Sequence, residues 1–197
     1  AVTHSWWLLA GGAVALPAAW FYTGGRRPYG YAGVGLSEML VFVFFGLLAV
    51  QGTLWVQAKL LPWQSWLLAA GIGLLSVALL MVNNLRDIST DTLSGKRTVA
   101  VRLGDRWSRR VYVGLVLVAL SLSLLVLFVP WPRIFAGGML QWGGGFVVQL
   151  SLWIGSLATM KPVLGGAKGP ELLPVLRNTG LLILAYGALL GLLFALV

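Results

Sequence analysis

The stretch GIGLLSVALLMV at residues 71–82 runs directly into NNLRDISTDTLSGKR at residues 83–97. The first segment is almost wholly apolar, whereas the second carries two aspartates, Asp87 and Asp91, among three basic side chains. An apolar run that ends abruptly in charged residues is typical of a membrane-spanning helix that emerges at the lipid surface. This junction therefore points to a membrane protein, and it raises the question of what the two carboxylates hold.

The composition agrees with a lipid environment. Of the 197 residues, 59% are hydrophobic and 10% are charged, whereas a soluble domain carries about 25% charged residues. Ten tryptophans fit the same view, because indole rings favour the lipid–water interface. The apolar runs are continuous and lack the alternation of barrel strands, so we expect an all-α, multi-pass transmembrane helical bundle.

Several classes of function are disfavoured by the residue inventory. The chain has no cysteine and only one histidine, His4, which excludes disulfides, thiolate metal sites and histidine clusters. The net charge of +9 is spread over residues that flank apolar runs and do not form a basic stripe on a soluble face, so we expect no nucleic-acid binding.

Six stretches have the length and apolarity of a spanning helix, for which about 17–25 residues are needed. The fifth is long and rich in glycine, so it is either tilted or interrupted near Gly143–Gly145. The six predicted spans are Trp6–Tyr22, Glu38–Gln57, Trp63–Val82, Val111–Val129, Ile134–Met160 and Thr179–Val197.

The charges of the connecting loops alternate. The loops around 23–36, 83–110 and 161–178 carry 2 + 7 + 3 = 12 basic residues, and the remaining two of the 14, Lys59 and Arg133, lie in loops on the other side. By the positive-inside rule, the three basic loops are cytoplasmic. The acidic stretch then faces the compartment that supplies soluble phosphorylated metabolites.

The spacing in the acidic stretch predicts chemistry. On a helix that continues past Val82, the side chains of Asn83, Asp87 and Asp91 share one face. Two carboxylates and an amide oxygen are hard ligands suited to Mg²⁺, whose coordination is often completed by substrate phosphates. The basic residues Arg86, Lys96 and Arg97 would contact phosphate oxygens. This spacing alone leaves open a simpler interpretation, in which a charged loop only solvates a turn and fixes the topology.

A second stretch, YTGGRRPYGY at residues 22–31, is predicted to lie on the same side as the aspartates. Its aromatic and basic residues are compatible with a membrane-interface anchor and equally with contacts to the substrate.

These residues resemble a known family. NNLRDISTDTLSGKRTVAVRLG at 83–104 is similar to the second aspartate-rich motif of the UbiA superfamily of intramembrane prenyltransferases, N-x-x-R-D-x-x-x-D followed by G-K-R-T. Tyr22-x-x-x-Arg26 is similar to the family's Tyr-x-x-x-Lys element, with arginine in place of lysine. VAVRLG, together with VGLSEMLVFVFFGLLAVQGTLWVQ at 34–57, looks like the branch that acts on 1,4-dihydroxy-2-naphthoate in menaquinone biosynthesis.

The resemblance implies a Mg²⁺-dependent transfer of a polyprenyl group from prenyl diphosphate to 1,4-dihydroxy-2-naphthoate, with loss of CO₂, giving demethylmenaquinone. The acceptor is alternatively another aromatic compound such as 4-hydroxybenzoate. Asp87 and Asp91 would be the catalytic metal ligands. The diphosphate would be bound by Arg86, Lys96, Arg97, Arg26, Tyr22, Asn83 and Asn84.

The resemblance also implies a location and a missing part. The protein would lie in the plasma membrane of a prokaryote, with membrane lipid around it and its active-site loops in the cytoplasm. The family has nine helices, and its first aspartate-rich motif, N-D-x-x-D-x-x-x-D, has no match here. We therefore expect residues 1–197 to form a single prenyltransferase domain that lacks the first three helices, as a fragment or processed piece without an initiating methionine.

The competing class is a non-enzymatic membrane transporter or assembly protein. Transporters usually place ionisable groups near the bilayer midplane, whereas the charges of this chain gather at the ends of the predicted spans. That distribution favours an enzyme that handles a lipid with a phosphate head.

Overall fold

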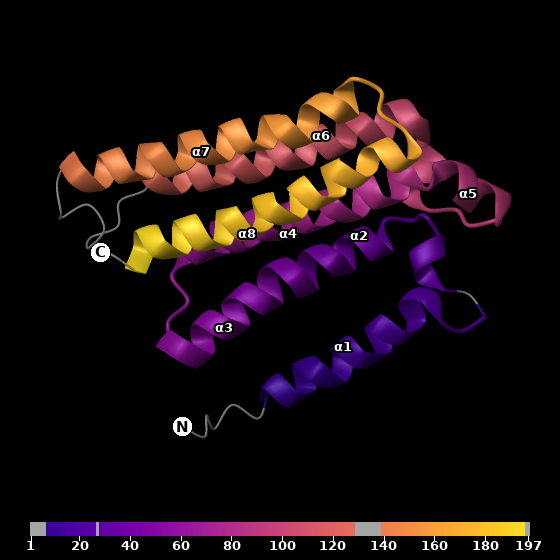
Figure 1. The fold of residues 1–197 in the computed structure, drawn as a ribbon. Helices are drawn as coiled ribbons and strands as arrows, with labels where there is room; N and C mark the ends of the chain where they lie inside the picture. The colour runs from indigo at the N-terminus through magenta and orange to yellow at the C-terminus, as the bar shows by residue number, and fades with distance from the viewer. Residues whose placement is uncertain (1–6, 27, 129–138, 196–197) are drawn as a thin grey trace.

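The computed structural model describes residues 7–26, 28–128 and 139–195, and these residues form helices joined by short connections (Figure 1). No strand occurs within these ranges. In chain order the elements are α1 (Trp7–Thr23), the 3₁₀ turn η1 (Tyr29–Tyr31), α2 (Leu36–Val41), the π-helix η2 (Phe42–Leu48), α3 (Ala49–Ala58), α4 (Trp63–Arg86), α5 (Ile88–Leu93), α6 (Val99–Phe128), α7 (Met139–Leu164), the 3₁₀ turn η3 (Gly169–Leu172) and α8 (Leu173–Ala195).

The predicted all-α membrane fold is confirmed. Five helical segments of the described chain are long and apolar enough to cross a membrane: 36–58, 63–86, 99–128, 143–164 and 169–192. The first predicted span corresponds to α1, whose 17 residues make it shorter than these five segments. The chain is therefore a multi-pass membrane protein.

The boundaries of three predicted spans need correction. Helix α6 begins at Val99, well before the predicted Val111, and its backbone kinks at Gly104 (φ 75°, ψ 169°). Helix α7 runs without a break through Gly143–Gly145, so an interruption there is wrong. The predicted start at Ile134 lies outside the described residues. The last helix begins at Leu173, six residues before the predicted Thr179, because the polar residues of its first turns do not prevent helix formation.

Helix α4 lies at the centre of the bundle. It packs against η2, α6 and α8, and α7 covers α6 and α8 from the other side (Figure 1). The core between these helices is built from side chains such as Leu75, Met81, Leu120 and Tyr112. The three basic loops lie together at one end of the bundle, next to α5, whereas the α3–α4 connection lies at the opposite end (Figure 1).

Two glycines allow α4 and η2 to approach closely. A Cβ atom on Gly46 would lie 2.5 Å from the Cα of Gly73, and a Cβ on Gly73 would lie 2.7 Å from the ring of Phe42. Small residues let membrane helices pack backbone against backbone. This contact fixes the α2–α3 arm, which contributes residues to the cavities described below.

A buried arginine fastens the N-terminal part of α6 to the α7–α8 connection. Arg109 donates from Nη1 to the Val163 carbonyl (2.6 Å) and from Nη2 to the Ala167 carbonyl (2.8 Å). Its charge is matched by Asp105 through two hydrogen bonds of 2.8 and 2.7 Å. Since a buried charge is tolerated only when it is paired and hydrogen-bonded, this network holds the two segments in one arrangement.

Replacing Gly46 by valine should weaken the bundle. The added side chain meets the backbone of α4, and overpacking of this kind costs about 1–3 kcal/mol. We expect Gly46→Val to lower the midpoint of thermal unfolding in detergent. Gly52→Val is the matched control, because a Cβ at Gly52, in α3 of the same arm, has no neighbour within 4 Å. Equal midpoints for the two variants would contradict the close packing.

Candidate active site

The acidic stretch folds as two helices and not as one. Helix α4 ends at Arg86, and α5 begins at Ile88 after Asp87, whose φ of −97° and ψ of 7° depart from helical values. The expected continuous helix from Asn83 to Asp91 is therefore wrong. Backbone hydrogen bonds nevertheless link Asp87 N to Asn83 O (3.3 Å) and Asp91 N to Asp87 O (2.8 Å), so the four-residue steps are kept.

The acidic residues line a polar cavity of about 190 Å³ at the end of the bundle. Six of the nine predicted site residues take part: Tyr22, Asn83, Asn84, Asp87, Asp91 and Lys96. Sequence reasoning did not assign the four other residues that line this acidic cavity, namely Thr23, Gly30, Tyr31 and Thr98. Tyr31 and Gly30 belong to the stretch YTGGRRPYGY, and their position favours substrate contact over a pure anchor.

Each aspartate has a basic partner. Arg86 donates to both carboxylate oxygens of Asp87, at 2.7 and 2.6 Å. Lys96 lies 3.5 Å from the carboxylate of Asp91, which is buried, and its ammonium also lies 4.7 Å from the centre of the Tyr31 ring. The basic side chain of each pair offsets part of the electrostatic repulsion between the two carboxylates.

Backbone contacts fold the 28–33 segment onto the loop after α5. The Arg97 amide donates to the Tyr31 carbonyl (3.1 Å). Gly33, at φ 63°, has no room for a side chain, since a Cβ would lie 1.9 Å from the Arg97 carbonyl. Tyr29 donates its hydroxyl to the Ala18 carbonyl of α1 (2.5 Å), and burial raises the pKa of this phenol. Tyr22 and Tyr31 both line the acidic cavity.

Three predicted phosphate ligands lie outside the acidic cavity. Arg86 points to Asp87 and does not line the cavity, and Arg26 is exposed in the connection after α1. Arg97 lines a neighbouring cavity of about 810 Å³, together with Lys96 and Arg102. We call this the basic cavity; its other lining residues are Pro28, Tyr31, Ala32, Val34, Ser94 and Gly95.

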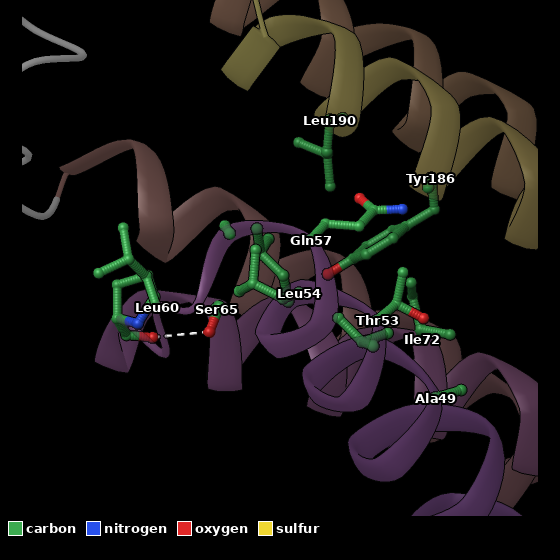
Figure 2. A pocket seen from close by; sticks show the side chains of 15 residues that line it. Ala49, Thr53, Leu54, Gln57, Leu60, Ser65, Ile72, Tyr186 and Leu190 are labelled. Carbon is green, nitrogen blue, oxygen red and sulfur yellow. Dashed lines mark hydrogen bonds between the residues drawn. The ribbon is translucent and has the colours of Figure 1, made fainter. Parts of the chain in front are cut away.

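Two apolar cavities lie between helices of the bundle. One of about 480 Å³ separates α1 from α2 and η2, and its wall includes Ala15, Phe44 and Tyr22, the last of which also lines the acidic cavity. The other, of about 620 Å³, lies among α3, α4 and α8 (Figure 2). Its walls carry Tyr186 and Gln57, and Ser65 beside them donates to the Pro62 carbonyl (2.6 Å).

The chain matches the model of a family described as the UbiA prenyltransferase family over residues 1–166. The chain belongs to this family. A relative named 1,4-dihydroxy-2-naphthoate octaprenyltransferase, from Mycobacterium tuberculosis, is 45% identical over 181 residues, which is 91% of this chain and 56% of that protein.

Two further relatives match a smaller share of this chain or match it at lower identity. The protein of the same name from Escherichia coli is 45% identical over 118 residues, covering 59% of this chain and 38% of that protein. The 2-carboxy-1,4-naphthoquinone phytyltransferase of Synechocystis is 26% identical, covering 77% and 48%. The chain thus spans about half the length of the first of these curated relatives. No solved structure matches the chain significantly.

UbiA prenyltransferases are generally metal-dependent. The donors of the acidic cavity fit a hard cation, because two carboxylates and two side-chain amides converge there. They do not form a complete site by themselves: the described part of the chain contains no cluster of three or more His, Cys, Asp or Glu side chains.

Proposed function

We propose that this chain carries the diphosphate-binding part of an enzyme that transfers a polyprenyl group to 1,4-dihydroxy-2-naphthoate with loss of CO₂. The observation that carries the proposal is the convergence of Asn83, Asp87, Asp91 and Lys96 on one cavity at the end of an apolar bundle. The names of the relatives from Mycobacterium tuberculosis and Escherichia coli support the same reaction.

In this proposal Asp87 and Asp91 hold Mg²⁺, and Asn83 and Asn84 supply amide oxygens beside them. When bound, the metal supplies positive charge to the diphosphate oxygens. Lys96 lies in the same cavity and donates to the leaving group as its negative charge grows. Arg86 holds the Asp87 carboxylate in place through two hydrogen bonds.

The remaining steps follow from the environment of the cavity. The allylic carbon–oxygen bond breaks, and an electron-rich ring carbon of the acceptor forms the new carbon–carbon bond while the carboxylate leaves as CO₂. A site that excludes water protects the allylic cation from hydrolysis. The apolar cavity beside α1 shares Tyr22 with the acidic cavity, so we assign the first isoprene units of the donor to it.

The distribution of charge supports a location. The three basic loops lie at the end that carries the acidic cavity (Figure 1), and the positive-inside rule supports a cytoplasmic position for this end. We propose the plasma membrane of a prokaryote as the site of the reaction, where the donor is supplied by the bilayer and the acceptor by the cytosol.

The two aspartates should control both turnover and the requirement for metal. Loss of a residue that merely orients a metal ligand costs about 10–100-fold, so we expect Asp87→Asn and Asp91→Asn to lower prenyl transfer by at least about 100-fold at limiting Mg²⁺. The measurement is transfer from octaprenyl diphosphate against free Mg²⁺, on the membrane-embedded protein at its natural length.

Glu171→Gln is the matched control for this experiment. It makes the same chemical change in an exposed cap of η3, where Glu171 accepts from the Lys168 amide at 3.0 Å, far from the acidic cavity in the chain. Near-normal turnover of either aspartate variant at limiting Mg²⁺ would falsify the metal assignment.

The acceptor should be the naphthoate. With 1,4-dihydroxy-2-naphthoate and 4-hydroxybenzoate offered at equal concentration, we expect the prenylated product to come from the naphthoate. A dominant prenylated benzoate would place the chain in a different branch of the family while leaving the role of the acidic cavity intact.

The position of the prenyl chain can be tested by filling the cavities. Ala15→Leu should lower kcat/KM for octaprenyl diphosphate several-fold, because the larger side chain occupies the apolar cavity beside α1. Ala13→Leu, on an exposed face of the same helix, is the control. If Gly187→Leu, which fills the cavity of Figure 2, is the variant that loses activity, the first isoprenes lie there instead.

A further inference from the structure

The basic cavity has no role in holding diphosphate in the account above. Its wall carries three cationic side chains, Lys96, Arg97 and Arg102. Among the described residues that line it there is no aspartate or glutamate. Arg97 and Arg102 are exposed to water, and the Arg102 side chain lies against Gly33, where a Cβ would come within 2.7 Å of its Nε. The described wall of the basic cavity is therefore cationic and partly exposed to water.

The basic cavity adjoins the acidic cavity through two shared residues, Tyr31 and Lys96. On its other side the acidic cavity shares Tyr22 with the apolar cavity beside α1. Three compartments therefore meet at the acidic cavity: one apolar, one with carboxylates and amides, and one cationic. Each has the chemistry of a different part of the two substrates.

We propose that the basic cavity captures the carboxylate of the anionic aromatic acceptor from the cytosol, before the ring reaches the diphosphate. This inference rests on the proposed function. It assigns Arg102 a role in substrate binding and moves Arg97 from the diphosphate to the acceptor.

Charge and ligand chemistry favour the acceptor over the donor. A diphosphate that carries Mg²⁺ needs oxygen ligands for the metal, and the wall of the basic cavity, as far as it is described, offers no carboxylate. A carboxylate needs only a guanidinium fork, which arginine presents in a planar and bidentate form. The ring of Tyr31 provides an aromatic surface beside this fork, on which a naphthalene ring can pack.

The test measures binding without prenyl donor, so it does not depend on turnover. The probes are 1-hydroxy-2-naphthoate, which has the carboxylate, and 1-naphthol, which lacks it. We expect Arg102→Gln to weaken binding of the naphthoate about tenfold, as for the loss of one charge-assisted hydrogen bond, and to leave 1-naphthol binding unchanged. Equilibrium dialysis against the natural-length protein in lipid nanodiscs gives both affinities.

Two control variants separate recognition from bulk charge and from misfolding. Arg106→Gln removes the same charge from an exposed position further along α6, beyond the kink at Gly104 and outside the basic cavity, and should bind both probes as the unmodified protein does. Arg102→Lys keeps the charge and should recover part of the naphthoate affinity. Arg102→Gln should also unfold at the same temperature as Arg106→Gln, because the Arg102 side chain is exposed.

Kinetics supply the second readout. In Arg102→Gln we expect a higher KM for the acceptor, with the KM for prenyl diphosphate and the kcat at saturating acceptor unchanged. Unchanged naphthoate affinity overturns the proposal. A raised KM for the donor assigns the cavity to diphosphate, and a defect that appears only with anionic lipids assigns it to a lipid headgroup. Absence of prenyl transfer by the unmodified protein would refute the proposed function but not the binding result.

Discussion

The buried carboxylate of Asp91 is the constraint on which the α5 end of the bundle depends. A charge held beside a lipid-facing bundle is tolerated only with a partner, and Lys96 supplies it from five residues further along the chain. The Lys96 amide also donates to the Asp91 carbonyl at 2.9 Å. These two contacts close the loop after α5, and the next residue, Arg97, can then donate its amide to Tyr31. These contacts thus bring Lys96 into the walls of both the acidic and the basic cavity, and Arg97 into the wall of the basic cavity.

The same pairs are weak enough to be exchanged. The side chains of Arg86 and Asp87 are 27% and 32% exposed, and that of Lys96 is 38% exposed. Ion pairs at such positions contribute about 0–1 kcal/mol to stability. A divalent cation or a diphosphate therefore competes with them at little energetic cost. The pairs serve to keep the carboxylates compatible with the fold in the absence of ligand, and the fold itself is held by the apolar core and by the buried Arg109 network.

The sequence predicted the helices better than the details of the site, for a physical reason. Apolar length is a local property, so α4 and the α2–α3 arm could be located from their residues alone. The break at Asp87 was missed, because the four-residue spacing of Asn83, Asp87 and Asp91 is compatible with an unbroken helix as well. The place of Arg97 in the wall of the basic cavity was missed because its backbone amide bonds to Tyr31, 66 positions away in the chain. Nothing in the neighbouring sequence distinguishes Arg102 from Arg106. The two differ in the structure, where Arg102 packs against Gly33.

The acidic cavity shares wall residues with one apolar and one cationic neighbour. In the proposed function, each of the three cavities receives a different part of the two substrates. A prenyl donor has a tail that prefers lipid and a head that requires cations, whereas its aromatic acceptor is a water-soluble anion. No single cavity can suit all three groups, because carboxylates that bind a metal repel an anionic acceptor. Tyr22 and Tyr31 lie between the cavities, since each lines the acidic cavity and one of its neighbours. The groups that repel each other are thereby kept in separate cavities. Lys96 lines both the acidic and the basic cavity. In the proposed function it therefore lies between the acceptor carboxylate and the leaving diphosphate, where its ammonium would lower the repulsion between these two anions.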